Sequence, residues 1–162
     1  MQTAYFSGGC FWCVEAIFQR VNGVIKVESG YCNGHTINPN YQDICTGATG
    51  HAEVVKIDFD DSIISFKKLL NVFFATHDST TLNQQGNDRG TQYRSAVFYI
   101  NSGQQSQATD MIAGMSINVV TEVSKLDVFY PAENYHQNYY NNNQNQSYCQ
   151  MLITPKINKY FQ

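Results

Sequence analysis

The sequence predicts an α+β protein, a two-layer sandwich in which helices pack on one mainly antiparallel or mixed sheet. Strand-type and helix-type apolar patterns are mixed along the chain without strict alternation, which is typical of this class. The length of 162 residues, 43% of them hydrophobic, suits a single domain over residues 1–162 with one sizeable core. From residue 134 the chain is rich in Asn, Gln and Tyr, which predicts a largely irregular tail over residues 134–162.

The N-terminal third reads as strand, helix, strand and loop. An apolar run predicts a strand over residues 3–7, and apolar residues at helical spacing predict a helix from about Phe11 to Arg20. Residues 23–34 begin with β-branched side chains and predict a strand that ends in a loop. Residues 35–50 are rich in Asn, Thr and Gly and predict a long loop, a kind of segment that is often functional.

Residues 51–59 form the clearest predicted strand. Val55, Ile57 and Phe59 alternate onto one face, and Glu53 falls on that same face. Burial there would raise the pKa of the Glu53 carboxyl and keep it protonated near neutral pH. The alternative is a solvated Glu53 at the end of the strand.

The rest of the chain before the tail predicts four further elements. They are a helix, a strand, a helix and a strand, over residues 65–77, 93–100, 102 onward and 118–123. Ser102 and Gln105 fit a capping box at the start of the second of these helices. Residues 78–91 predict another polar loop.

Composition excludes several classes of function. The formal net charge is −3, which gives no electrostatic basis for binding nucleic acid or an anionic membrane. No apolar run approaches the ~20 residues that a membrane-spanning helix needs, and no secretory signal follows Met1. We therefore expect a cytoplasmic protein, and a monomer by default.

Cys10 is the candidate nucleophile. It follows two glycines and precedes the first predicted helix, whose positive end favours the thiolate form of cysteine. Phe11 and Trp12 add an apolar surface that suits a methyl or thioether group. The alternative is a cysteine that only fills space in the core. The chain has five cysteines, and this odd number argues against a secreted disulfide scaffold.

Several separated motifs, taken in order, resemble the A-type peptide methionine sulfoxide reductases. They are GGCFW at 8–12, NPNY at 38–41, TGATGHAEVV at 46–55, NDRGTQYRS at 87–95, ENYHQ at 133–137 and YC at 148–149. The resemblance runs from the N-terminus almost to the end of the chain. Several motifs in the right order are far more specific than any one of them.

The resemblance implies a mechanism for reducing methionine S-sulfoxide, either peptide-bound or free. Cys10 attacks the sulfoxide sulfur, and Phe11 and Trp12 receive the substrate methyl group. Glu53 is the acid that protonates the sulfoxide oxygen, a role that needs a neutral carboxyl. Methionine is released and Cys10 becomes a sulfenic acid.

The resemblance also implies the remaining site residues and the reductant. Tyr41 and Tyr93 donate hydrogen bonds to the sulfoxide oxygen, and Asp88 helps to bind the substrate. Cys149 condenses with the sulfenic acid to a disulfide that thioredoxin reduces. Neither a metal nor an organic cofactor is expected, and oxidised proteins and free methionine sulfoxide are the expected substrates.

Cys13 is the rival to Cys149 as the resolving thiol. Relatives often carry a small residue such as Gly at its position, so a Cys10–Cys13 disulfide stays open in this chain. Two cysteines at i and i+3 within a helix are displaced along its axis, which strains a bridge between them. Cys32 and Cys45 are expected to be packing residues.

Two other classes of protein compete with this interpretation. Cys10-Phe11-Trp12-Cys13 is a C-x-x-C motif, which is typical of thioredoxin-like disulfide exchangers. That class leaves the buried-face glutamate and the tyrosines unexplained. A zinc module would use Cys10, Cys13, Cys32 and Cys45, but no second C-x-x-C pair follows, which disfavours structural zinc.

Overall fold

A six-stranded mixed sheet organises the computed structural model, which describes residues 1–161. The strand order is β7-β6-β1-β3-β2-β8, and only the β6–β7 pair is parallel. The strands of this sheet are β1 (Gln2–Ser7), β2 (Val24–Cys32), β3 (Ala52–Phe59), β6 (Ala96–Tyr99), β7 (Glu122–Lys125) and β8 (Phe129–Pro131). A separate hairpin joins β4 (Gln84–Gln85) to β5 (Asp88–Arg89).

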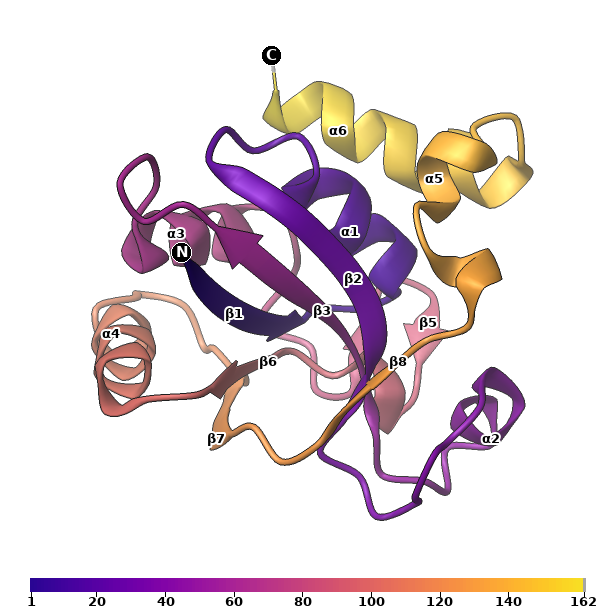
Figure 1. The fold of residues 1–162 in the computed structure, drawn as a ribbon, viewed down its shortest axis with the longest axis horizontal. Helices are drawn as coiled ribbons and strands as arrows, with labels where there is room; N and C mark the ends of the chain where they lie inside the picture. The colour runs from indigo at the N-terminus through magenta and orange to yellow at the C-terminus, as the bar shows by residue number, and fades with distance from the viewer. Residues whose placement is uncertain (162) are drawn as a thin grey trace.

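Helices cover one face of this sheet, and in Figure 1 the strands β1, β3 and β2 lie in front of α1. The α-helices are α1 (Phe11–Phe18), α2 (Tyr41–Cys45), α3 (Phe66–Ala75), α4 (Ser102–Ala113), α5 (Tyr139–Asn142) and α6 (Thr154–Tyr160). Two 3-10 turns, η1 (Thr91–Tyr93) and η2 (Asn134–His136), and one π-helical turn, η3 (Cys149–Ile153), complete the elements. Within residues 1–161 no helix has the length and apolarity that crossing a membrane requires.

Alternation along β1 and β3 separates two apolar clusters on the two faces of the sheet. Phe6 and Ile57 face α1 and α3 in the main core, where the Phe6 ring stacks on Phe73 with centroids 4.9 Å apart. Tyr5 and Val54 face the other side and pack in a smaller cluster that the chain around β8 covers. The predicted two-layer α+β class, with helices on a mainly antiparallel or mixed sheet, is therefore confirmed.

Polar segments contain more regular structure than the sequence indicated. The loop predicted over residues 35–50 contains α2, which Asn40 and Asp43 cap reciprocally. The loop predicted over residues 78–91 contains the β4–β5 hairpin and begins η1. Local hydrogen bonds rather than an apolar pattern stabilise these short elements, so periodicity does not reveal them.

Two predicted boundaries differ from the structure. The Ser102–Gln105 capping box is wrong: Asn101 is the N-cap of α4, and its side chain accepts from the Gln104 backbone N–H at 2.9 Å. The predicted strand at residues 118–123 is displaced, since β7 covers Glu122–Lys125. The short edge strand β8 was not predicted at all.

The tail is more ordered than the irregular segment predicted over residues 134–162. Its described part contains η2, α5, η3 and α6, and Figure 1 shows α5 and α6 beside α1. Glu15 of α1 anchors this segment, because its carboxyl accepts from the backbone N–H groups of Asn138 at 2.9 Å and Tyr139 at 3.2 Å. The tail has no long apolar pattern, and the buried carboxyl of Glu15 helps to fix it on α1 instead.

The Glu15 anchor makes stability depend on pH. Its side chain is 1% exposed, and burial raises its pKa from the ordinary 4.5 to about 7, against the two N–H donors that lower it. The folded state therefore holds this proton more tightly, and the resulting stabilisation is complete below pH 4.5 and is lost as pH rises through about 7.

We expect the free energy of unfolding of wild type, minus that of Glu15→Gln, to fall by about 3 kcal/mol as pH rises from 4.5 to above 7. Urea unfolding of both proteins at several pH values measures it. Asp110→Asn, at an exposed carboxylate on α4, is the matched control and should show no such trend. A difference that stays constant with pH would show that Glu15 does not titrate in this range.

Candidate active site

Cys10 lies between the end of β1 and the start of α1. Its backbone is extended, with φ −62° and ψ 128°, and it is the N-cap of the helix. Gly9 before it has φ +91°, and a Cβ there would meet the Gln85 side chain at 2.7 Å, so glycine permits the turn that presents the cysteine. Cys10 lines a cavity of about 310 Å³ together with Asp88 and Tyr148.

The surroundings of Cys10 favour the neutral thiol. Burial is the largest effect and raises its pKa, and the nearby Glu53 and Cys13 raise it further. The Trp12 backbone N–H and the Tyr148 hydroxyl lower it, but the net direction is upward. Burial thus opposes the thiolate that the helix N-terminus alone would favour.

Glu53 lies on the buried face of β3, as the alternation predicts. The side chain is 2% exposed, and its Oε1 accepts from the Phe11 backbone N–H at 3.1 Å. Burial raises the pKa of the carboxyl to about 8, the Phe11 N–H lowers it, and Asp88 raises it. The solvated alternative is thereby excluded, and Glu53 is a neutral acid at pH 7 beside the residue that follows Cys10.

The two predicted tyrosines stay protonated near this carboxyl. Burial raises the phenol pKa of both Tyr41 and Tyr93, and Glu53 is the next largest cause for each. Tyr41 begins α2 within the first polar loop. Tyr93 ends η1, so it lies just after the second polar loop and not in the strand predicted over residues 93–100.

Glu133 holds Tyr41 in place. Its carboxylate accepts from the Tyr41 backbone N–H at 2.8 Å and from the Tyr31 hydroxyl at 2.9 Å. Glu133, the first residue of the ENYHQ motif and the residue just before the tail, therefore positions a loop that is far away in sequence.

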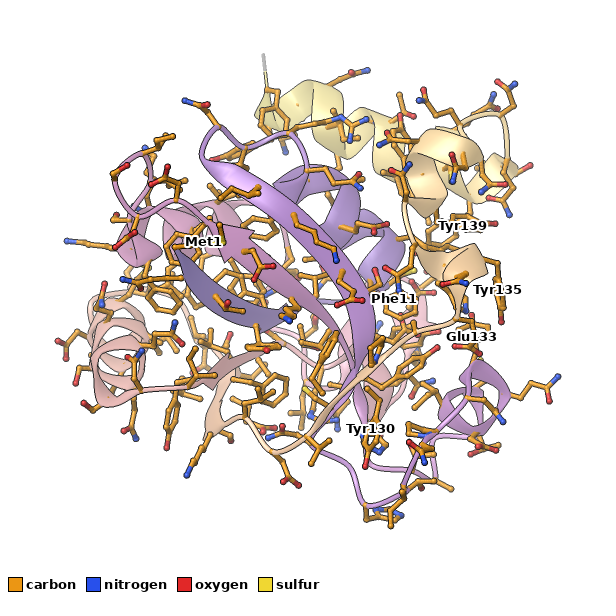
Figure 2. All side chains as sticks on the ribbon, in the orientation of Figure 1. Met1, Phe11, Tyr130, Glu133, Tyr135 and Tyr139 are labelled. Atoms are coloured by element: carbon orange, nitrogen blue, oxygen red, sulfur yellow. The ribbon has the colours of Figure 1, made fainter. Side chains whose placement is uncertain are left out.

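Phe11 and Trp12 form an aromatic wall that the tail completes. Phe11 is 1% exposed and packs against His136, with ring centroids 5.1 Å apart. The Trp12 indole N–H donates to His136 Nδ1 at 2.9 Å, and its ring stacks on Tyr139 at 3.8 Å. Figure 2 shows Phe11 on the same side of the molecule as Glu133, Tyr135 and Tyr139.

Tyr148 links Asp88 to the nucleophile. Its hydroxyl donates to Asp88 Oδ2 at 2.8 Å, and the same hydroxyl lies close enough to Cys10 to lower the pKa of that thiol. Sequence reasoning marked His136 only as a motif histidine that helps to shape the site, and it assigned no role to Glu133, Tyr139 or Tyr148. Three of the four stand within the quoted motifs ENYHQ and YC, so motif membership was the available signal.

Cys149 is buried beside Cys13. The two thiols belong to one apolar cluster with Tyr140 and Ile153, and all five cysteines are free. Cys149 and Ile153 are fully buried in this cluster, so this part of the tail has apolar anchors that the mobile segment expected from the sequence would lack.

The geometric objection to a Cys10–Cys13 bridge does not apply. That objection places both residues inside a helix, whereas Cys10 is the extended N-cap and only Cys13 has helical backbone. Both cysteines line the cavity around Cys10.

The remaining candidates separate into packing and surface residues. Cys32 is buried in the smaller cluster as expected, but Cys45 is exposed, so its assignment as a packing residue is wrong. It ends the short helix α2, whose one buried residue is Ile44. Among residues 1–161, no group of three or more His, Cys, Asp or Glu side chains is arranged to hold a metal ion.

Comparisons with known proteins match this site and fold. A sequence model of the family "Peptide methionine sulfoxide reductase" matches residues 2–162. A protein of Ruthia magnifica named peptide methionine sulfoxide reductase MsrA is 71% identical over 161 residues, which are 99% of each chain.

Solved structures of known proteins share the fold of this chain. Reduced Mxr1 from Saccharomyces cerevisiae has a TM-score of 0.86 and 29% identity, covering 91% of this chain and 88% of its own. A structure of Mxr1 in complex with Trx2 shares the fold with a TM-score of 0.60 at 19% identity, covering 85% and 84% of the two chains. The match of the family model along almost the whole chain, together with the 71% identity, shows that this chain belongs to the peptide methionine sulfoxide reductases of the MsrA type.

Proposed function

We propose that the protein reduces methionine S-sulfoxide, in oxidised proteins and as the free amino acid, with Cys10 as the nucleophile and Glu53 as the acid. The observation that carries this proposal is the neutral, buried carboxyl of Glu53, which binds the backbone N–H of Phe11 next to Cys10. A protonated acid at this place is what cleavage of a sulfur–oxygen bond at neutral pH needs. The consequence is repair of oxidised methionine.

The Cys10 thiol and the Glu53 carboxyl together supply the electrons and protons of the reductive step. The Cys10 sulfur bonds to the sulfoxide sulfur while Glu53 gives its proton to the sulfoxide oxygen. The resulting hydroxyl group then moves to the Cys10 sulfur as the bond between the two sulfurs breaks. The Cys10 thiol proton returns the Glu53 carboxylate to its acid form. The sulfoxide takes two electrons and becomes methionine, and Cys10 is oxidised to the sulfenic acid, which carries the oxygen.

The protonated phenols of Tyr41 and Tyr93 donate hydrogen bonds to the sulfoxide oxygen. Charge grows on this oxygen as the bond to sulfur breaks, so donors in a buried site stabilise the transition state most. Phe11 and Trp12 receive the methyl group, and Asp88, held by Tyr148, helps to bind the substrate. The rigid aromatic wall supports this role, because both rings are fixed by contacts with His136.

Recycling follows through a disulfide. The Cys149 thiol condenses with the Cys10 sulfenic acid, a Cys10–Cys149 disulfide forms and water leaves. Thioredoxin then takes the disulfide by thiol exchange, is oxidised itself and returns both cysteines to thiols. The solved complex of yeast Mxr1 with Trx2 supports this choice of reductant.

The nucleophile assignment predicts that Cys10→Ser forms no methionine in a single turnover without added reductant. The serine hydroxyl is a far weaker nucleophile than the thiol. Methionine formed per enzyme is measured by chromatography after mixing with the separated S and R epimers. Cys32→Ser, at a buried thiol in the other cluster, is the control and should form methionine from the S epimer. Methionine from the Cys10 variant would contradict the assignment.

The acid assignment predicts that Glu53→Gln slows methionine formation by about 10²- to 10⁴-fold. Because the pKa of Glu53 is raised to about 8, its acid form is present below that pH and is lost above it. The ratio of wild-type to variant single-turnover rates should therefore decline as pH rises through about 8. A variant that binds weakly but reacts at the normal rate would show that Glu53 only binds substrate.

The resolver assignment predicts that Cys149→Ser makes methionine once per enzyme and then stops turning over with thioredoxin, whereas Cys13→Ser turns over almost normally. Peptide mapping of the oxidised wild type should find Cys10 linked to Cys149. Cys32→Ser again serves as the control. Mapping that finds Cys10–Cys13, together with a Cys149→Ser enzyme that keeps its rate, would exclude Cys149.

A further inference from the structure

The cavity around Cys10 carries two opposite charges. Among the described residues, Asp88 and Lys156 are the charged side chains of its lining. Asp88 comes from the β4–β5 hairpin and already accepts the hydrogen bond from Tyr148. Lys156 comes from α6 in the tail, so hairpin and tail place a carboxylate and an ammonium on walls of one cavity.

Lys156 has no carboxylate partner within the described part of the chain. The ion pairs there join the N-terminus to Asp61 and Arg94 to Glu122. Its ammonium lies close enough to the Cys13 thiol to lower the pKa of that thiol, and its side chain is half-buried. A half-buried cation that lines the cavity of Cys10, without an ion pair in the described part of the chain, is placed to meet an anion on a ligand.

A second cavity continues from the first. It has a volume of about 530 Å³, lies between the end of α3 and α6, and shares Lys156 and Gln85 with the cavity around Cys10. Lys159, one helical turn further along α6, lines only the second cavity. Lys156 is therefore the basic residue that the two cavities share.

The second cavity is lined by one carboxylate, Asp78, and by the two ammonium groups of Lys156 and Lys159. His77 also lines it, and burial lowers the pKa of its imidazole to about 4, so this ring is neutral. The end of α3 also carries the negative pole of its helix dipole. Of the two lysines on α6, only Lys156 also lines the cavity around Cys10, so Lys156 is the cation placed to meet a substrate there.

We propose that Lys156 is a specificity-determining residue that binds a carboxylate of the substrate close to the sulfoxide. This inference rests on the proposed function, since it deals with the substrate of that same site. In methionine sulfoxide only the γ- and β-methylenes and Cα separate the sulfur from the α-carboxylate, so a substrate held at Cys10 brings that group near the cavity wall. The side chain of an acidic residue next to the sulfoxide in a peptide is the second source of a carboxylate.

The test compares matched substrates in single turnover, with reduced enzyme and no thioredoxin, so that recycling thiols do not enter. The first pair is N-acetylmethionine sulfoxide, which keeps the α-carboxylate, and its neutral methylamide. The second pair is the N-acetyl dipeptide amides of methionine sulfoxide followed by Asp or by Asn. The measured quantity is the ratio of second-order rate constants for the anionic and the neutral member of each pair.

We expect Lys156→Gln to lower this ratio by about fivefold in at least one pair, the size expected for one partly exposed charge pair. Lys156→Arg should keep the ratio, and Lys156→Glu should move it below that of Lys156→Gln. Lys159→Gln, one turn along the same helix, is the matched control and should leave the ratio as in wild type. The ratio in wild type should also fall with added salt.

The outcomes separate the possible readings. A change confined to the first pair identifies the α-carboxylate, and one confined to the second pair identifies a neighbouring acidic side chain. Equal losses for all substrates would overturn the proposal and assign Lys156 to tail packing or to the Cys13 thiol. An unchanged ratio in both pairs would overturn it as well. If wild type forms no methionine from any of these substrates, the proposed function itself fails.

Discussion

The hydrogen bond from the Phe11 N–H to the Glu53 carboxyl is the constraint on which the site depends. It ties the first turn of α1 to the middle of the sheet at the place where the helix presents Cys10. The Glu53 carboxyl keeps its proton at neutral pH only while water is excluded from it. This requires that β3 hold Glu53 on its buried face and that α1 cover it. The burial that keeps Glu53 protonated also raises the pKa of Cys10, so burial favours the neutral form of both side chains.

Strong periodicity allowed the sequence to predict the sheet, the long helices and the position of Glu53. Strand alternation alone puts Glu53 with Ile57 on the helix-covered face, and the structure agrees. The candidate nucleophile and the substrate-contacting candidates came from motif resemblance. Of these, Cys10 and Asp88 line one cavity, whereas Tyr41 and Tyr93 do not line it. Periodicity could not find α2 or the hairpin of β4 and β5, because short side-chain caps and turns define them.

The tail was the least predictable part, for a physical reason. Its anchors are single polar contacts with distant residues, such as the N–H groups of Asn138 and Tyr139 on Glu15. No pattern within residues 134–160 reveals a partner on α1, nor that a π-helical turn buries Cys149 beside Cys13. A polar composition therefore suggested an irregular segment where long-range contacts build a wall of the site.

The indole of Trp12 sits where these parts meet, since it donates to His136, stacks on Tyr139 and meets Tyr148 edge-on. It is also the one tryptophan in the chain. Its emission therefore comes from a single position, and three residues of the tail set the polarity and quenching around it. The protein thus carries an intrinsic fluorophore for the docking of its own C-terminal segment, readable during the catalytic cycle without a label.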